Sequence, residues 1–160
     1  MADTPGGATT RSGPRAPTLV LLDADTVAGW RRAEPSLEQL RRARADLVAE
    51  HSDLRVAVLA DPAIKWALPE SEHDDFERAI VARDLVCAPA GTRDGHDGWV
   101  AAVIAQARAN GETVVMVTDR ALAGVPVARL RFEGGRFRFD LQGASEVSAR
   151  ATPQWRRRRR

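Results

Sequence analysis

The stretch Thr18 to Asp23, TLVLLD, decides how this chain folds. The run from Thr18 to Leu22 shows no polar alternation, which is typical of a strand buried on both faces of a parallel sheet. It ends in Asp23, and ligands bind at the carboxyl ends of strands in such sheets. Three further apolar runs repeat the pattern, at Arg55 to Ala60, Leu85 to Ala88 and Thr113 to Val117.

Helical segments separate these runs. Ser36 followed by Gln39 matches a capping box, and the apolar residues after it recur at helical spacing. A second helix follows Ser71, and a third carries Asp97 in its first turn and stops at Asn110. The alternation of strands and helices predicts an α/β fold, with a mostly parallel sheet and helices on both faces.

The C-terminal part predicts a β-hairpin. Polar and apolar residues alternate on both sides of Glu133-Gly134-Gly135, which places two antiparallel strands at the edge of the sheet. We expect three segments: a disordered leader at 1–16, one globular domain at 17–142 and a disordered tail at 143–160 that ends in an Arg run.

Composition narrows the class of protein. Apolar residues make up 44% of 160 residues, no apolar stretch approaches the ~20 residues that span a bilayer, and no signal peptide is recognisable. We therefore expect a soluble cytoplasmic domain with no membrane partner. The single Cys87 with three histidines excludes a zinc finger. Without Arg156 to Arg160 the chain is net negative, so the tail is either a nucleic-acid arm or a solvated end.

Three aspartates, Asp23, Asp97 and Asp119, fall where the predicted strands end or a helix begins. If the first and fourth strands are neighbours, the three carboxylates converge. Two unit charges ~4 Å apart repel by roughly 4 kcal/mol at an effective dielectric of 20, so such a cluster calls for a cation. Oxygen ligands suit Mg²⁺ or Mn²⁺, which can activate a water for attack on a phosphodiester. The pattern predicts a metal-dependent nuclease domain.

Other polar residues lie near these positions. Asp25 and Asp94 are additional candidate acids, and His96 could serve as a general base or contact a phosphate. Each also has a structural explanation as a loop residue, a helix cap or a solvated helix start.

Loop cations are candidates for holding the RNA backbone. Arg93 and Arg120 suit bidentate phosphate contacts, and Lys65 lies beside Trp66, which could stack on an unpaired base. Surface roles remain open for all four.

Four segments in order carry a family resemblance. They are LLDADTVAG (21–29), RVAVLADPAIKW (55–66), DLVCAPAGTRDGHDGWVAAVIAQA (84–107) and GETVVMVTDRAL (111–122). Together they resemble the NYN branch of the PIN-like ribonucleases, and especially the Regnase-type domain. The resemblance implies a PIN-like fold, cleavage of single-stranded RNA, Mg²⁺ or Mn²⁺ as cofactor and RNA as partner. The oligomeric state is open, and a homodimer is one candidate.

The resemblance also assigns residues. It places the metal-binding aspartates at Asp23, Asp97 and Asp119, and Thr26 where the family usually has an Asn that orients the site. Two departures reduce the number of carboxylates: His96 precedes Asp97 where the family often has two adjacent acids, and Ala123 replaces a further acid. Asp25 or Asp94 would supplement the set.

Two other functions fit parts of the same pattern. The departures favour a catalytically weak RNA-binding module that kept the fold. The segment DADTV also resembles the nucleophile loop of haloacid-dehalogenase-type phosphatases, with Asp23 as nucleophile, Asp25 as acid and base, and Thr118 as the second motif. That chemistry needs a later lysine, and Lys65 is the only lysine in the chain.

Overall fold

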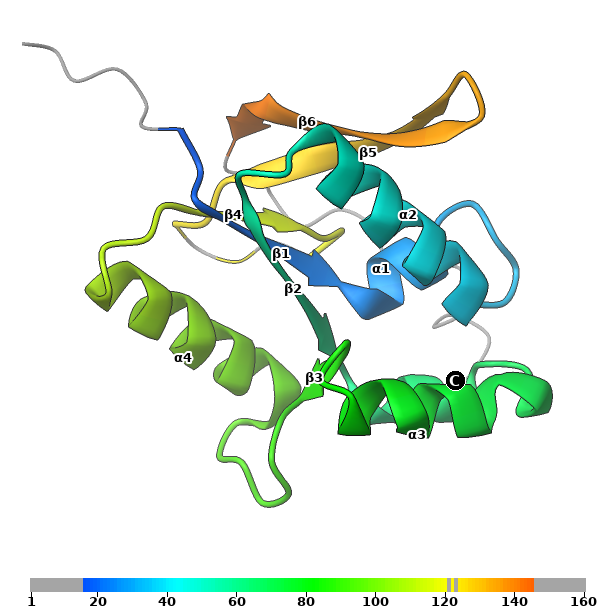
Figure 1. Cartoon of the computed structure of the whole chain (residues 1–160). Coiled ribbons are helices and arrows are strands. Elements are labelled where there is room, and N and C mark those ends of the chain that lie inside the picture. The colour runs from blue at the N-terminus through cyan, green and yellow to red at the C-terminus, as the bar shows by residue number, and fades with distance from the viewer. Residues whose placement is uncertain (1–15, 121, 123, 146–160) are drawn as a thin grey trace, which may run out of the picture.

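The TLVLLD motif forms the central strand of a six-stranded sheet (Figure 1). The computed structural model describes residues 16–120, 122 and 124–145. The strands are β1 (Leu19–Asp23), β2 (Arg55–Ala60), β3 (Val86–Cys87), β4 (Val114–Val117), β5 (Val127–Glu133) and β6 (Arg136–Ser145). Their order is β3-β2-β1-β4-β5-β6, and all neighbours are parallel except the antiparallel pair β5 and β6.

Helices cover both faces of this sheet. They are α1 (Ala24–Ala28), α2 (Leu37–Glu50), α3 (His73–Val81) and α4 (Gly95–Ala109), with two short 3₁₀ helices, η1 (Pro62–Trp66) and η2 (Glu70–Glu72). Alternate residues of β1 face opposite sides. Val20 and Leu22 join the core under α1, α2 and α3, whereas Leu19 and Leu21 pack with α4, which lies apart from the other helices (Figure 1). Each of the four is at most 3% exposed, and each such burial contributes roughly 1.5–3 kcal/mol.

The register of the strands aligns the carboxyl edge. Asp23 is opposite Leu59 of β2, and Leu22 is opposite Val117, the last residue of β4. Asp23 therefore extends one position beyond β4 and lies beside Thr118. β1 and β4 are neighbours, which was the condition for the acidic residues to converge.

The predicted fold class is confirmed: a single α/β domain with a mostly parallel sheet and a C-terminal edge hairpin. Two local features differ from the sequence prediction. Asp23 directly caps a five-residue helix, α1, by accepting from the Asp25 N–H at 3.2 Å. Ser36 caps α2 as expected, but the Gln39 side chain does not complete a capping box. It donates instead to the carbonyls of Val27 at 2.8 Å and Trp30 at 3.0 Å.

The predicted tail boundary at 143 is wrong, because β6 continues through Ser145, which pairs with Val127 of β5. The leader up to residue 15, the Arg run and Ala123 lie outside the described residues, so the expectations for them stay predictions. Within the described part of the chain, no helix combines the length and the hydropathy needed to cross a bilayer.

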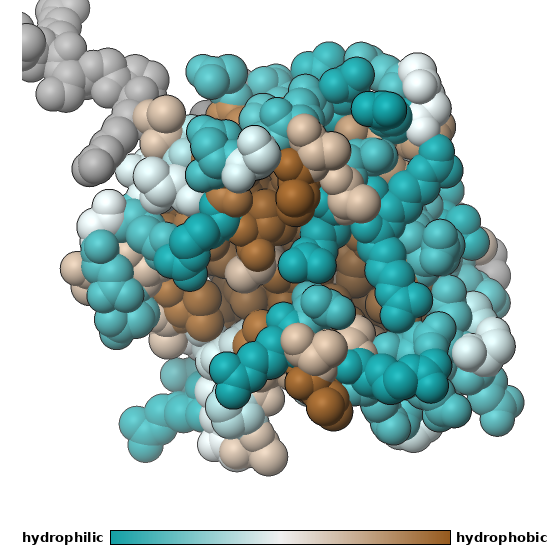
Figure 2. Space-filling model, in the orientation of Figure 1, coloured by the Kyte–Doolittle hydropathy of each residue, from teal (hydrophilic) through white to brown (hydrophobic). Residues whose placement is uncertain are grey.

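Apolar surface remains between the helices. Figure 2 shows hydrophobic residues in a hollow in the middle of the face that Figure 1 presents, bordered by hydrophilic side chains. A cavity of about 430 Å³ lies between α2, β2 and α3, with Leu40, Val58, Ala79 and Leu85 among its walls. None of the candidate acids lines it, so it is separate from the site described below.

Candidate metal centre at the carboxyl edge of the sheet

Asp23 is a buried carboxylate whose oxygens are held by hydroxyl and backbone donors. It is 1% exposed and lies between β2 and β4 at the end of β1. The Thr118 hydroxyl donates to Oδ2 at 2.7 Å, and the Thr26 hydroxyl reaches the same oxygen at 3.0 Å. The Asp25 N–H donates to Oδ1. These donors fix the orientation of the carboxylate without neutralising it.

Thr26 links Asp23 to Asp119. Its Oγ1 lies 2.8 Å from Oδ1 of Asp119 and accepts from the Asp119 N–H at 3.1 Å. A hydroxyl has one proton, so it cannot donate to both carboxylates at once. Burial, together with the charge of Asp23, raises the pKa of Asp119 despite its bond from Thr26. Thr26 thus orients two acids.

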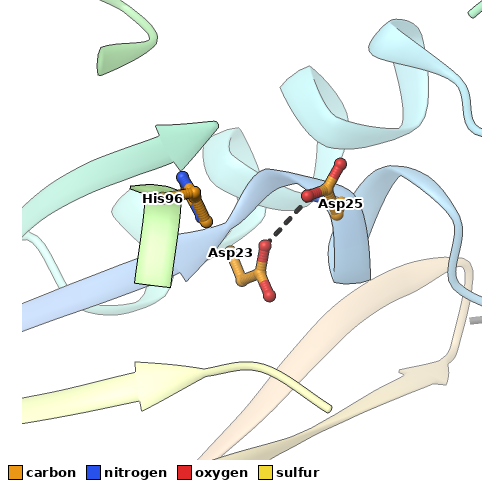
Figure 3. A group of neighbouring side chains, drawn as sticks. All are labelled: Asp23, Asp25 and His96. Atoms are coloured by element: carbon orange, nitrogen blue, oxygen red, sulfur yellow. Dashed lines mark hydrogen bonds between the residues drawn. The ribbon is translucent and has the colours of Figure 1, made fainter. Parts of the chain in front are cut away.

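Asp25 is completely buried at the start of α1 and points toward Asp23 and His96 (Figure 3). Burial, together with the negative charges of Asp23, Asp61 and Asp119, raises the pKa of Asp25 to about 8 against the opposing effect of Arg120. At neutral pH the carboxyl therefore keeps its proton, and a metal ion bound there would have to displace it.

Arg120 is an internal counter-ion for this acidic cluster. Its guanidinium hydrogen-bonds to Asp97 and lies 3.5 Å from Oδ2 of Asp25 and 3.9 Å from Oδ2 of Asp23. Burial lowers the pKa of Arg120, but the surrounding carboxylates raise it on balance. Its Nη2 has no hydrogen-bond partner among the described residues, so Asp25 holds this nitrogen by charge rather than by a directed bond.

One group of side chains in the described residues has metal-ligand spacing. Asp23, Asp25 and His96 each offer a ligand atom, and these atoms all lie within 4.8 Å of one another (Figure 3). Nδ1 of His96 is buried and has no hydrogen-bond partner among the residues that the structure describes. A free ring nitrogen beside two carboxylates fits a divalent cation. The nitrogen ligand favours Mn²⁺ over Mg²⁺, because Mg²⁺ prefers oxygen donors.

Gly98 shapes the turn that presents His96 and Asp97. Asp94 adopts a left-handed conformation (φ 62°) just before α4, and a Cβ on Gly98 would lie 2.6 Å from the Asp94 Cβ. Only glycine allows this approach. Asp94 itself is exposed and does not belong to the metal-ligand group.

The other predicted residues lie farther out. The Asp97 side chain is 66% exposed and reaches the cluster only through Arg120. Lys65 pairs with Glu77 and lies over Trp66, which is itself 66% exposed. Arg93 is exposed and forms no ion pair within the described residues. Contacts through Thr26 and Arg120 thus connect Asp23, Asp97 and Asp119. The group with metal-ligand spacing shares Asp23 with this set, but its other members are Asp25 and His96.

Sequence reasoning overlooked Asp61. It directly follows β2, caps η1 by accepting from the Ala63 N–H at 3.0 Å, and its charge contributes to the raised pKa of Asp25. The rule that selected Asp23, an acid directly after a buried strand, would have found it. Cys87 ends β3 at the same edge. Burial raises the pKa of this thiol to about 11, which rules out a thiolate nucleophile at neutral pH.

Among solved structures, the chain is similar to the crystal structure of nuclear proteinaceous RNase P 2 (PRORP2) from A. thaliana. The TM-score is 0.53 at 14% sequence identity, over 81% of this chain and 30% of that chain. This chain therefore spans less than a third of PRORP2. No family model and no curated protein matches the sequence.

The fold and the site together define an α/β domain with a candidate acidic metal centre, similar in fold to PRORP2. An identity of 14% supports the fold alone. The activity is therefore argued from the residues at the carboxyl edge.

Proposed function

We propose that this protein is a metal-dependent ribonuclease that cleaves single-stranded RNA at the carboxyl edge of its sheet. The observation that carries the proposal is the group Asp23, Asp25 and His96, with ligand atoms within 4.8 Å of one another. Asp119 joins it through Thr26, and Asp97 joins it through Arg120. Such a concentration of acids at a strand edge has a high electrostatic cost that a bound cation would offset.

A bound Mn²⁺ or Mg²⁺ would polarise a phosphoryl oxygen and lower the pKa of an attacking water. Asp23, Asp25 and His96 would hold it. Thr118 and Thr26 fix the Asp23 carboxylate in one orientation. Asp119, with its raised pKa, is the candidate to accept a proton beside the scissile phosphate.

The direct test is cleavage of a labelled single-stranded RNA with Mn²⁺, with Mg²⁺ and with excess EDTA. We expect cleavage with Mn²⁺, slower cleavage with Mg²⁺ because of the imidazole ligand, and none in EDTA. Full activity in EDTA would exclude the mechanism.

Arg120 supplies a specific reason to keep the RNA-binding module as a second candidate. Its guanidinium already neutralises part of the charge that a cation would neutralise. A protein that binds RNA in EDTA but never cleaves it with any divalent metal would fit this alternative.

The phosphatase alternative also retains one supporting observation. The Thr118 hydroxyl donates to Asp23, and Asp25 keeps its proton at neutral pH, as an acid partner of a nucleophile would. Lys65, the only lysine in the chain, pairs with Glu77 and not with the acidic cluster. Turnover of a small chromogenic phosphate ester would favour this reading.

Removing the Arg120 charge is expected to strengthen metal binding. In Arg120→Gln, a cation no longer competes with a guanidinium for Asp23 and Asp25. One unit charge a few Å away, at an effective dielectric of 20, corresponds to roughly tenfold or more in affinity. Free Mn²⁺ followed by electron paramagnetic resonance measures the change. Arg131→Gln removes the same charge at an exposed pair on the hairpin and should leave the affinity unaltered. Equal or weaker Mn²⁺ binding by Arg120→Gln would refute the role of Arg120 as counter-ion.

The remaining expectations extend this proposal. They are a specific kinship with Regnase-type domains, a cytoplasmic location, and phosphate contacts from Arg93 and Lys65. A homodimer remains one open oligomeric state.

A further inference from the structure

A second polar feature, outside the acidic cluster, lies between the α1–α2 loop and the edge hairpin. It is a groove of about 360 Å³, a volume typical of small-ligand sites. Its walls carry three arginines and three aromatic rings: Trp30, Arg31, Arg32, Arg42, Phe132 and Phe137. We call this the arginine–aromatic groove. It contains none of the residues assigned to the metal centre.

Stacked cation–ring pairs form two sides of the groove. The Arg31 guanidinium lies 4.5 Å from the Trp30 ring centroid, and that of Arg42 lies 5.4 Å from Phe132. Both rings also meet Phe137 edge-on, at centroid distances of 5.8 and 5.0 Å. Phe137 is 4% exposed, whereas Phe132 is 43% exposed. The buried ring of Phe137 thus supports the rings of Trp30 and Phe132, and Phe132 faces solvent.

The positive charge in the groove is not neutralised by carboxylates. Within the described residues, Arg31, Arg32 and Arg42 form no ion pair within 4 Å, although several other arginines of the domain do. Arg32 and Arg42 donate instead to the backbone carbonyls of Glu34 and Gly135. The one acid in the wall is Glu38, so three positive charges face one negative charge.

This charge and these rings match one chemistry, that of an unpaired nucleotide. Phosphates pair with guanidinium groups, and unpaired bases stack on aromatic rings and on guanidinium planes. A duplex offers the phosphates but keeps its base faces covered. The groove therefore favours a single strand over a duplex.

The groove is connected to the metal centre by the chain itself. α1 begins directly after Asp23 and ends two residues before Trp30, a helix length of about 7.5 Å. Gln39 fixes the far end of α1 by donating to Val27 and Trp30. A strand bound in the groove would thus be held a few nucleotides from the acids.

We propose that the arginine–aromatic groove binds a segment of single-stranded RNA next to the segment to be cleaved. This inference rests on the proposed ribonuclease function and assigns its substrate a second point of attachment. Arg31, Arg32 and Arg42 hold phosphates, and the stacks on Trp30 and Phe132 receive a base.

The test is binding of a fluorescent single-stranded RNA of about 10 nucleotides, measured by anisotropy over a range of salt concentrations in EDTA, so that no cleavage occurs. The variant Arg31→Gln/Arg32→Gln should bind roughly tenfold more weakly at low salt. Its slope of log K against log salt should be shallower by about 1.4, which is 0.7 per lost phosphate contact. Arg42→Gln is a second, independent variant, with an expected decrease of about 0.7.

The matched control is Arg131→Gln/Arg138→Gln, which removes two charges from the same hairpin where they are paired with Asp140 and Glu50. It should keep the wild-type slope. Phe132→Leu should weaken binding to the single strand but not to a duplex of the same sequence, because only unpaired bases stack. Thermal unfolding of each variant verifies the fold.

Wild-type affinity and slope in both groove variants would overturn the inference, as would equal losses in the control. An acidic peptide that competes with RNA for the wild type but not for the groove variants would instead assign the groove to a protein partner. Failure of the ribonuclease proposal is separable, since it would appear as groove-dependent RNA binding without cleavage in Mn²⁺. Cleavage with unchanged binding by the variants would refute the groove alone.

Discussion

Replacing Asp23 by Asn is expected to abolish metal-dependent RNA cleavage while leaving the fold intact. Asn keeps the size of the side chain and one oxygen that can accept from Thr118, but it removes the charge that binds a cation. Losing a central carboxylate ligand removes several kcal/mol of transition-state stabilisation, which corresponds to roughly a thousandfold in rate. Single-turnover cleavage with Mn²⁺ measures this loss.

The control for this variant is Asp84→Asn, an exposed acid that pairs with Arg44 and does not belong to the metal-ligand group. It should cleave RNA at the wild-type rate. Thermal unfolding should show that Asp23→Asn is at least as stable as the wild type in EDTA, because the charge of Asp23 no longer raises the pKa values of Asp25 and Asp119. Undiminished cleavage by Asp23→Asn would remove Asp23 from the mechanism.

Replacing Asp25 by Asn is expected to stabilise the metal-free protein at alkaline pH much more than at acidic pH. In the unfolded chain Asp25 ionises near its ordinary pKa of 3.8, whereas in the folded protein it keeps its proton up to about pH 8. The folded state binds more protons between these values, so rising pH progressively costs stability across that window. Each unit of pKa difference corresponds to roughly 1.4 kcal/mol, and the total is on the order of several kcal/mol.

Urea unfolding in EDTA from pH 5 to pH 9 tests this expectation. The free energy of unfolding of the wild type should fall relative to that of Asp25→Asn as pH rises, and the difference should level off above about pH 8. Asp84→Asn again serves as the control and should run parallel to the wild type. Parallel curves for Asp25→Asn would mean that Asp25 is ionised in the folded protein.

Much of the fold could be predicted because its signals are local. The buried run at Leu19–Asp23 and the alternation on both sides of Gly134-Gly135 each determine one strand arrangement without reference to the rest of the chain. The position of Asp23 follows from the same reasoning, since the end of a buried parallel strand is also the ligand edge.

The membership of the site was less predictable because it depends on side-chain directions across different elements. His96 and Asp97 are adjacent on α4, yet His96 joins Asp23 and Asp25 while Asp97 turns outward to Arg120. Which neighbour faces inward is set by how α4 packs on the sheet. Arg120 was predicted to hold a phosphate at the edge of the site, but it lies among the acids themselves. The spacing of residues along the sequence does not indicate this position.

α1 and the role of Gln39 were missed for a similar reason. A five-residue helix has too few positions to show periodicity, and it exists because Asp23 caps its first turn. The Gln39 side chain meets the carbonyls of Val27 and Trp30 only after the chain has turned back on itself.

The position of α4 makes the metal centre conditional on docking. Asp23 and Asp25 come from β1 and α1, whereas His96 comes from α4, which packs on the other face through Val100, Ile104 and Ala107. A cation bound by all three would therefore connect β1 and α1 to α4 on the other face of the sheet. By thermodynamic linkage, its binding energy would add to the docking energy of α4, so α4 would be held more firmly in the metal-bound protein than in the metal-free one.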